Sequence, residues 1–347
     1  MRTIIISLAV LAVGLSAANA RPAQVSIRAP ESLEASIDWI NDYPRKHDFA
    51  HAPAAIKAFS RYGGFKNPDA SGVYVGFIAG LLGAHSEQAD KLIDGMMPVR
   101  GEDQWAVVRG IAYSGLPDWK DLLRRHAYQL ENRPIMVADY LNGRLPTLGT
   151  LSIKPSPTTW ERMKDAFAID WGKKPEKPVE LEASPETLDV LWGYYLASGS
   201  YGPVLRMVEM LPWSKDRDSV DKLTVGSMAK FTLASNATRD TELLAKLQTI
   251  RNAKSQTKET VALLDEVIHA AQVADTAKLR KDALAAIEQL KIKGPNYKRE
   301  VSTWAKVGQG ALAAGCVTAA ALGQVELGLP CVLGGGATNA AMYYMNN

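Results

Sequence analysis

Ser227 and Lys230 form the pair whose spacing comes closest to that of a catalytic nucleophile and its base. They stand three positions apart in the stretch VGSMAK, so one turn of a helix would bring the hydroxyl near the amine. A lysine with a lowered pKa can accept the hydroxyl proton and so activate the serine for attack. The chemistry expected of such a pair is acyl transfer or hydrolysis.

This stretch is similar to the nucleophile motif of the serine β-lactamases, penicillin-binding proteins and related esterases, which often have Gly before the Ser and an aromatic residue after the Lys, as Phe231 is here. The resemblance implies a hydrolase with Ser227 as nucleophile and Lys230 as base. That superfamily places the motif early, on a fold that requires a β-sheet. It follows the motif with a Tyr-x-Asn or Ser-x-Asn element and a Lys-Thr-Gly-like strand. Here the motif lies two-thirds of the way along the chain, no Lys-Thr-Gly follows, and the one later Tyr-x-Asn begins at Tyr344, at the chain end. We therefore interpret the motif as a chance pattern on an amphipathic helix.

His47 and His51 form the second chemical pattern, HDFAH. On a helix, two histidines four positions apart share one face and can bind zinc. Pro44 and Pro53 leave room for barely two helical turns, and no third ligand is evident nearby. We therefore expect a loop between two helices, no metal and no cofactor, and we assign no catalytic or ligand-binding residue from the sequence.

The N-terminus has the three successive parts of a secretory signal peptide: a basic residue, an apolar run and small residues before a cleavage site. Arg2 precedes an uncharged apolar run over residues 4–15, and small residues at Ala18 and Ala20 precede Arg21. The run is shorter than the roughly 20 apolar residues that a membrane span needs. We predict cleavage after Ala20 and a periplasmic or secreted mature chain.

Cys316 and Cys331 are the two cysteines of the chain. An oxidising compartment favours a disulfide between them, and two reduced buried thiols are the alternative. Both lie in residues 308–347, a Gly- and Ala-rich apolar segment whose one charged side chain is Glu326. We interpret this segment as a buried helical hairpin; a membrane-contacting hairpin and a protein-docking surface are the alternatives.

The rest of the chain shows apolar residues at helical spacing. Residues 104–123 and 189–208 each read as a helix, a Ser-Gly turn, a proline and a second helix, which is a helical hairpin. Residues 73–97 form a looser copy with Gly83 at the turn. Stacked helical pairs resemble tetratricopeptide-like and other α-solenoid families in layout. Extended structure is expected only at 148–153 and 179–181.

The predicted fold class is all-α, with helical hairpins packed as an irregular α-solenoid or a multi-helix bundle and a C-terminal helical hairpin. Prolines and charged residues between 143 and 184 indicate a linker or arm. The predicted organisation is a signal peptide (1–20), an N-terminal helical region (21–142), the Pro-rich segment (143–184), a region of hairpins and long helices (185–307) and the apolar segment (308–347).

The charge balance and the helical layout limit the classes of function that we expect. Forty basic and 37 acidic residues give a net charge of +3, so nucleic acid is not an expected partner. We predict an exported, non-enzymatic adaptor or binding protein that holds a protein or peptide in grooves between helices, with Tyr194, Tyr195 and Tyr201 as candidate lining residues. The alternative is a membrane-associated structural protein acting through residues 308–347. A hydrolase using Ser227 and Lys230, or a metal site at His47 and His51, is the third hypothesis.

Overall fold

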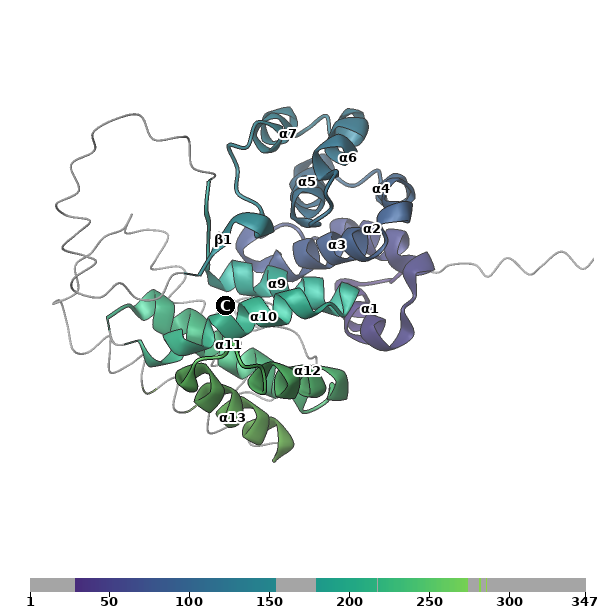
Figure 1. The fold of residues 1–347 in the computed structure, drawn as a ribbon. Coiled ribbons are helices and arrows are strands. Elements are labelled where there is room, and N and C mark those ends of the chain that lie inside the picture. The colour runs from purple at the N-terminus through teal and green to yellow at the C-terminus, as the bar shows by residue number, and fades with distance from the viewer. Residues whose placement is uncertain (1–28, 154–178, 217, 274–280, 282–284, 286–347) are drawn as a thin grey trace, which may run out of the picture.

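A computed structural model describes residues 29–153, 179–216 and 218–273, with single positions at 281 and 285. Over these residues the chain is all-α (Figure 1). The helices are α1 (Leu33–Lys46), α2 (Ala52–Arg61), α3 (Gly72–Ala84), α4 (Ala89–Met96), α5 (Gln104–Tyr113), α6 (Trp119–His126), α7 (Pro134–Leu141), α9 (Pro185–Ser198), α10 (Tyr201–Glu209), α11 (Val220–Ala237), α12 (Thr241–Arg251) and α13 (Lys258–Gln272).

Helix α3 forms the centre of the fold. It is apolar around its whole circumference, which is typical of a buried helix, and 11 of its 13 residues are buried. Its main neighbour is α9, and the two backbones touch. A Cβ atom on Gly76 would lie 1.9 Å from the carbonyl oxygen of Val190, and one on Gly193 would lie 2.0 Å from that of Val73. Only glycine allows this approach.

The other helices lie in layers on the two sides of α3 and α9 (Figure 1). Helix α5 packs against α3, and α6 and α7 pack against α5. On the other side, α10 and α11 contact α9, and α12 and α13 contact α11. A central helix covered from opposite sides is the arrangement of a bundle. Of the two predicted arrangements, the multi-helix bundle is the one observed.

The two predicted helical hairpins are confirmed. Gly115 follows α5 with φ 74°, and Gly199 ends α9 with φ 61°, the left-handed conformation that glycine adopts without strain. The looser pair also forms, as α3 and α4, but α3 continues to Ala84. The prediction that Gly83 lies at the turn is therefore wrong. A Cβ atom on Gly83 would lie 2.3 Å from the hydroxyl of Tyr194, so packing explains this glycine.

The two predicted extended stretches are confirmed in part, because each contributes a two-residue strand while Leu148–Thr150 forms a 3₁₀ turn. Strand β1 (Leu151–Ser152) pairs in parallel with β2 (Leu181–Glu182). The long helices predicted within residues 185–307 are observed as α11, α12 and α13. Most of the chain from 274 to 307 lies outside the described residues, as do the signal peptide, Cys316, Cys331 and the whole of 308–347. Within the described residues, no helix has the length and apolar character needed to span a bilayer.

Candidate functional site

A groove of about 840 Å³ lies between α1 and the junction of α11 with α12. The last turns of α9 form its floor, where Trp192, Tyr195 and Leu196 are buried apolar residues. Their spacing of i, i+3 and i+4 places all three side chains on one face of α9. The volume falls within the range of about 300–1,000 Å³ that is usual for ligand sites. We refer to this feature as the α9 groove.

One hydrogen bond joins the floor of the α9 groove to its wall. The hydroxyl of Tyr195 donates to Oδ2 of Asp240, at 2.6 Å. The other carboxylate oxygen of Asp240 accepts from the backbone N–H of Leu243 at 2.9 Å and so caps the start of α12. Burial raises the pKa of Tyr195 above its usual value of 10, and the bond to Asp240 acts in the same direction. The phenol is therefore a neutral donor at physiological pH.

The walls of the α9 groove carry more acidic than basic groups. Hydrogen bonds from Lys46 and Arg45 hold the pKa of Asp42 below its usual value of 3.8, so this carboxylate stays ionised. Asp38 is exposed, and it makes no hydrogen bond or ion pair with any residue that the structure describes. The charged groups that line the α9 groove are Asp38, Asp42, Asp240 and Glu242, against Arg45 and Arg239.

The three tyrosines predicted to line a groove lie in different places. Tyr195 lies in the α9 groove, as expected from its helical spacing. Tyr194 points elsewhere, because its hydroxyl donates to the backbone oxygen of Ser114 at 2.8 Å. Tyr201 is half-exposed and donates to the backbone oxygen of Lys246 at 3.1 Å. The sequence therefore identified one floor residue, and it did not identify Asp240, whose link to Tyr195 spans 45 positions.

Ser227 and Lys230 both lie on α11, but their surroundings are those of packed residues. Ser227 is buried. The ammonium group of Lys230 forms an ion pair with Glu266 of α13. Gly226 precedes the serine because the backbone near Trp213 packs there: a Cβ atom on Gly226 would lie 2.2 Å from the backbone nitrogen of Ser214. Close packing thus accounts for the glycine that made the motif resemble a nucleophile sequence.

His47 and His51 do not share a helical face. His47 ends α1 in the left-handed conformation, with φ 46°. His51 closes a short 3₁₀ turn, and its Nδ1 lies 2.6 Å from Oδ1 of Asp48. The predicted loop between two helices is therefore observed. In the part of the chain that the structure describes, no three His, Cys, Asp or Glu side chains lie close enough together to hold a metal ion.

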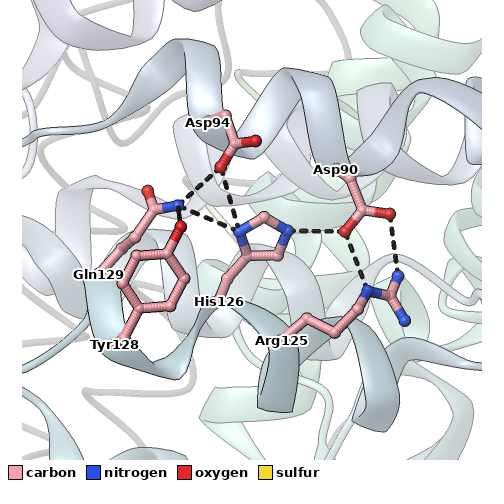
Figure 2. A network of polar contacts seen from close by, with 6 residues as sticks. All are labelled: Asp90, Asp94, Arg125, His126, Tyr128 and Gln129. Atoms are coloured by element: carbon pink, nitrogen blue, oxygen red, sulfur yellow. Dashed lines mark hydrogen bonds and ion pairs between the residues drawn. The ribbon is translucent and has the colours of Figure 1, made fainter.

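A second polar cluster surrounds the buried imidazole of His126 (Figure 2). Its Nε2 lies 2.8 Å from Oδ1 of Asp90, and its Nδ1 lies 3.5 Å from Oδ1 of Asp94. The guanidinium of Arg125 donates to both oxygens of Asp90, at 3.0 Å each. Gln129 donates to Asp94 at 2.6 Å. These side chains satisfy one another's hydrogen-bonding groups. We therefore interpret the cluster as a set of polar contacts that joins α4 to α6 and to the turn after α6.

This cluster predicts how stability depends on pH. The pKa of Asp90 is lowered from its usual value of 3.8, first by the hydrogen bond from Arg125 and also by that from His126. A carboxylate with a lowered pKa stabilises the folded state above its unfolded pKa, and this contribution is lost as the pH falls through the folded pKa. Asp90→Asn should therefore cost about 0.2–1 kcal/mol at pH 7, the range for an exposed pair, and progressively less below about pH 4.

Urea denaturation of the wild type and Asp90→Asn at neutral and acidic pH measures this difference. Glu87→Gln is the control, because Glu87 is an exposed carboxylate close in sequence to α4 and outside the cluster. It should leave the urea midpoint unchanged at both pH values. A loss for Asp90→Asn that stays the same at acidic pH would contradict the proposed role of its ionised form.

No protein-family model, no curated protein and no solved structure matches this chain. What the α9 groove binds is therefore inferred from its own residues, distances and charges.

Proposed function

We propose that the protein is an exported helical binding protein whose α9 groove holds a short peptide with basic side chains. The observation that carries this proposal is the composition of the groove: a buried aromatic and aliphatic floor below walls with four carboxylates and two guanidinium groups. An apolar floor supplies most of the affinity in a ligand site, and a few charged groups set its selectivity.

The position of Asp38 favours a basic peptide over an acidic one. Asp42 is already paired with Arg45 and Lys46, and Glu242 is paired with Lys246. Asp38 is the exposed carboxylate of α1 that lines the groove, where a ligand lysine or arginine can approach it. Complementary charge across an interface raises the association rate and discriminates against acidic ligands.

Fluorescence anisotropy on the mature chain tests this proposal, with a labelled alanine–arginine peptide beside the same peptide carrying glutamate in place of arginine. The arginine peptide should bind and the glutamate peptide should not. Asp38→Asn should weaken binding by up to about fivefold, because an exposed ion pair contributes about 0.2–1 kcal/mol. The dependence on Asp38 should weaken as salt is added.

Glu34→Gln is the matched control, because Glu34 is an exposed carboxylate on the same helix that does not line the groove. It should leave the peptide affinity unchanged. Equal binding of the two peptides, or an equal effect of the two substitutions, would contradict the basic-peptide proposal. Concentration-dependent dimerisation that Asp38→Asn weakens would instead identify a second copy of the chain as the occupant.

A further inference from the structure

A second groove, of about 910 Å³, lies between the end of α10 and the start of α13. Val208 and Trp213 on its apolar side are buried, and Leu205 is half-buried. We refer to this feature as the α10 groove. Its apolar side chains come from the residue after β1, from α10 and from the 3₁₀ turn that follows α10: Ile153, Leu205, Val208, Pro212 and Trp213.

The rim of the α10 groove is acidic. Among the described residues that line it, one ammonium group stands against four carboxylates: Lys215 against Glu209, Asp216, Asp218 and Glu259. Glu259 is exposed in the first turn of α13. Attraction of a basic ligand depends on this net charge and not on an unpaired carboxylate. An apolar groove with an acidic rim fits an amphipathic helix that carries basic residues beside its apolar face.

A stretch of the chain itself starts at this groove. Ile153 lines the α10 groove and directly precedes residues 154–178, which lie outside the described residues. Residues 154–178 also connect β1 to β2, and these strands pair in parallel. Parallel strands need a crossover connection, which is usually a helix. The position and the strand pairing both favour a helix that packs close to where the connection begins.

The sequence of residues 154–178 matches the groove in polarity and in charge. Trp160, Met163, Phe167 and Trp171 follow one another at i, i+3, i+7 and i+11, which is the spacing of one apolar helical face. Six basic and four acidic side chains give the stretch a net positive charge, opposite to that of the rim. Three of the basic residues come after the apolar positions: Lys173, Lys174 and Lys177.

We propose that residues 160–171 dock in the α10 groove as an amphipathic helix, with Trp160, Met163 and Phe167 against its apolar side. The three lysines that follow then lie near the acidic rim. The covalent connection at Ile153 makes this docking intramolecular, with an effective concentration in the millimolar range, so a weak intrinsic affinity is sufficient to keep the groove occupied. Of the linker and the arm that the sequence indicates for this part of the chain, the proposal selects the arm.

Hydrogen exchange measured by mass spectrometry on the full mature chain tests the docking. Residues 160–171 should exchange more slowly than in a synthetic peptide of residues 154–178, which represents the undocked segment. Phe167→Ala, which removes an apolar contact, and Leu205→Asp, which places a charge on the apolar side of the groove, should each raise this exchange at least about tenfold. Exchange in α3 should stay as in the wild type, which shows that the fold is intact.

Each of these substitutions has a matched control. Asp165→Ala changes the same stretch at a position off the apolar spacing, and Ile135→Asp places the same charge on an exposed apolar residue away from the groove. Both should leave the exchange of residues 160–171 unchanged. Wild-type exchange as fast as that of the free peptide would overturn the proposal, and so would protection that survives both Phe167→Ala and Leu205→Asp. Protection that is lost on dilution of the protein would also overturn it, because a second copy would then fill the groove.

A labelled peptide of residues 154–178 tests the occupation of the groove independently. It should bind at least about tenfold more tightly to the Phe167→Ala chain, whose own segment docks poorly, than to the wild type, whose groove is occupied. Adding Leu205→Asp to Phe167→Ala should abolish this binding. Equal affinity for the wild type and Phe167→Ala would contradict occupation by the chain's own segment. If Leu205→Asp does not fold, the comparison of Phe167→Ala with the wild type still decides the proposal.

Discussion

Replacing Gly76 with alanine is expected to lower the free energy of unfolding by about 3 kcal/mol or more, near the upper end of what overpacking costs. The new Cβ atom would lie 1.9 Å from the carbonyl oxygen of Val190. That oxygen belongs to the backbone of α9, so no side-chain rotation can relieve the clash, and the two central helices must move apart. Urea denaturation followed by tryptophan fluorescence measures the loss, and a low soluble yield would have the same cause.

Gly202→Ala is the control for this prediction. Gly202 lies in α10, and a Cβ atom there would meet nothing within 4 Å. Gly202 is the second residue of its helix and precedes Pro203, so the gain in helix propensity is smaller than in a helix interior and is partly offset by contact with the proline ring. This substitution should change stability by no more than about 1 kcal/mol. A Gly76→Ala protein as stable as the wild type would show that α3 and α9 do not approach as closely as the structure indicates.

The elements that could be predicted from the sequence are those set by local patterns. A glycine after an apolar helix, followed by a proline, specifies a turn within a few residues, and the hairpins at Gly115 and Gly199 formed as expected. Gly83 also follows an apolar run, although no proline comes soon after it, and the turn predicted there is wrong. This glycine is explained by its contact with Tyr194, which is far away in the chain. A local pattern does not distinguish a glycine needed for a turn from one needed for packing.

The central contact between α3 and α9 could not be predicted for the same reason. Gly72, Gly76 and Gly80 recur every four residues, which places them on one face of α3. This spacing indicates that something packs closely there. Nothing in it identifies α9, which begins more than 100 residues later, as the partner.

The candidate site shows the same division between local and distant information. The floor of the α9 groove could be predicted in part, because the helical spacing of Trp192 and Tyr195 is visible in the sequence. Its walls come from α1 and from the α11–α12 junction. Asp240 does carry a local signal, as an acidic residue just before a helix, but that signal predicts a cap and not a bond to Tyr195. Ser227 and Lys230 are the opposite case. Their local pattern resembles a catalytic motif, but in the fold both residues make ordinary packing and ion-pair contacts.

Phe77→Ala is the second substitution with a large expected effect, and it tests whether packing in the core positions a wall of the α9 groove. Phe77 of α3 is fully buried, with its ring centroid 5.6 Å from that of Trp39 and 5.1 Å from that of Tyr43. Both of those residues lie on α1, so this cluster holds α1 against α3. Deleting the ring should cost about 3–5 kcal/mol, since it removes buried apolar surface and leaves a cavity.

The same substitution should weaken peptide binding, because α1 carries Asp38 and Asp42 on one wall of the groove. Hydrogen exchange should rise first in α1, where the cluster is lost, and less in α12 on the opposite wall. Ile135→Ala is the control, because Ile135 is an apolar helix residue that is 76% exposed, and its loss should change stability by no more than about 0.5 kcal/mol. If Phe77→Ala lowered stability while α1 exchange and peptide affinity stayed as in the wild type, α1 would be held by other contacts. That result would contradict our inference that the position of the groove wall depends on this part of the core.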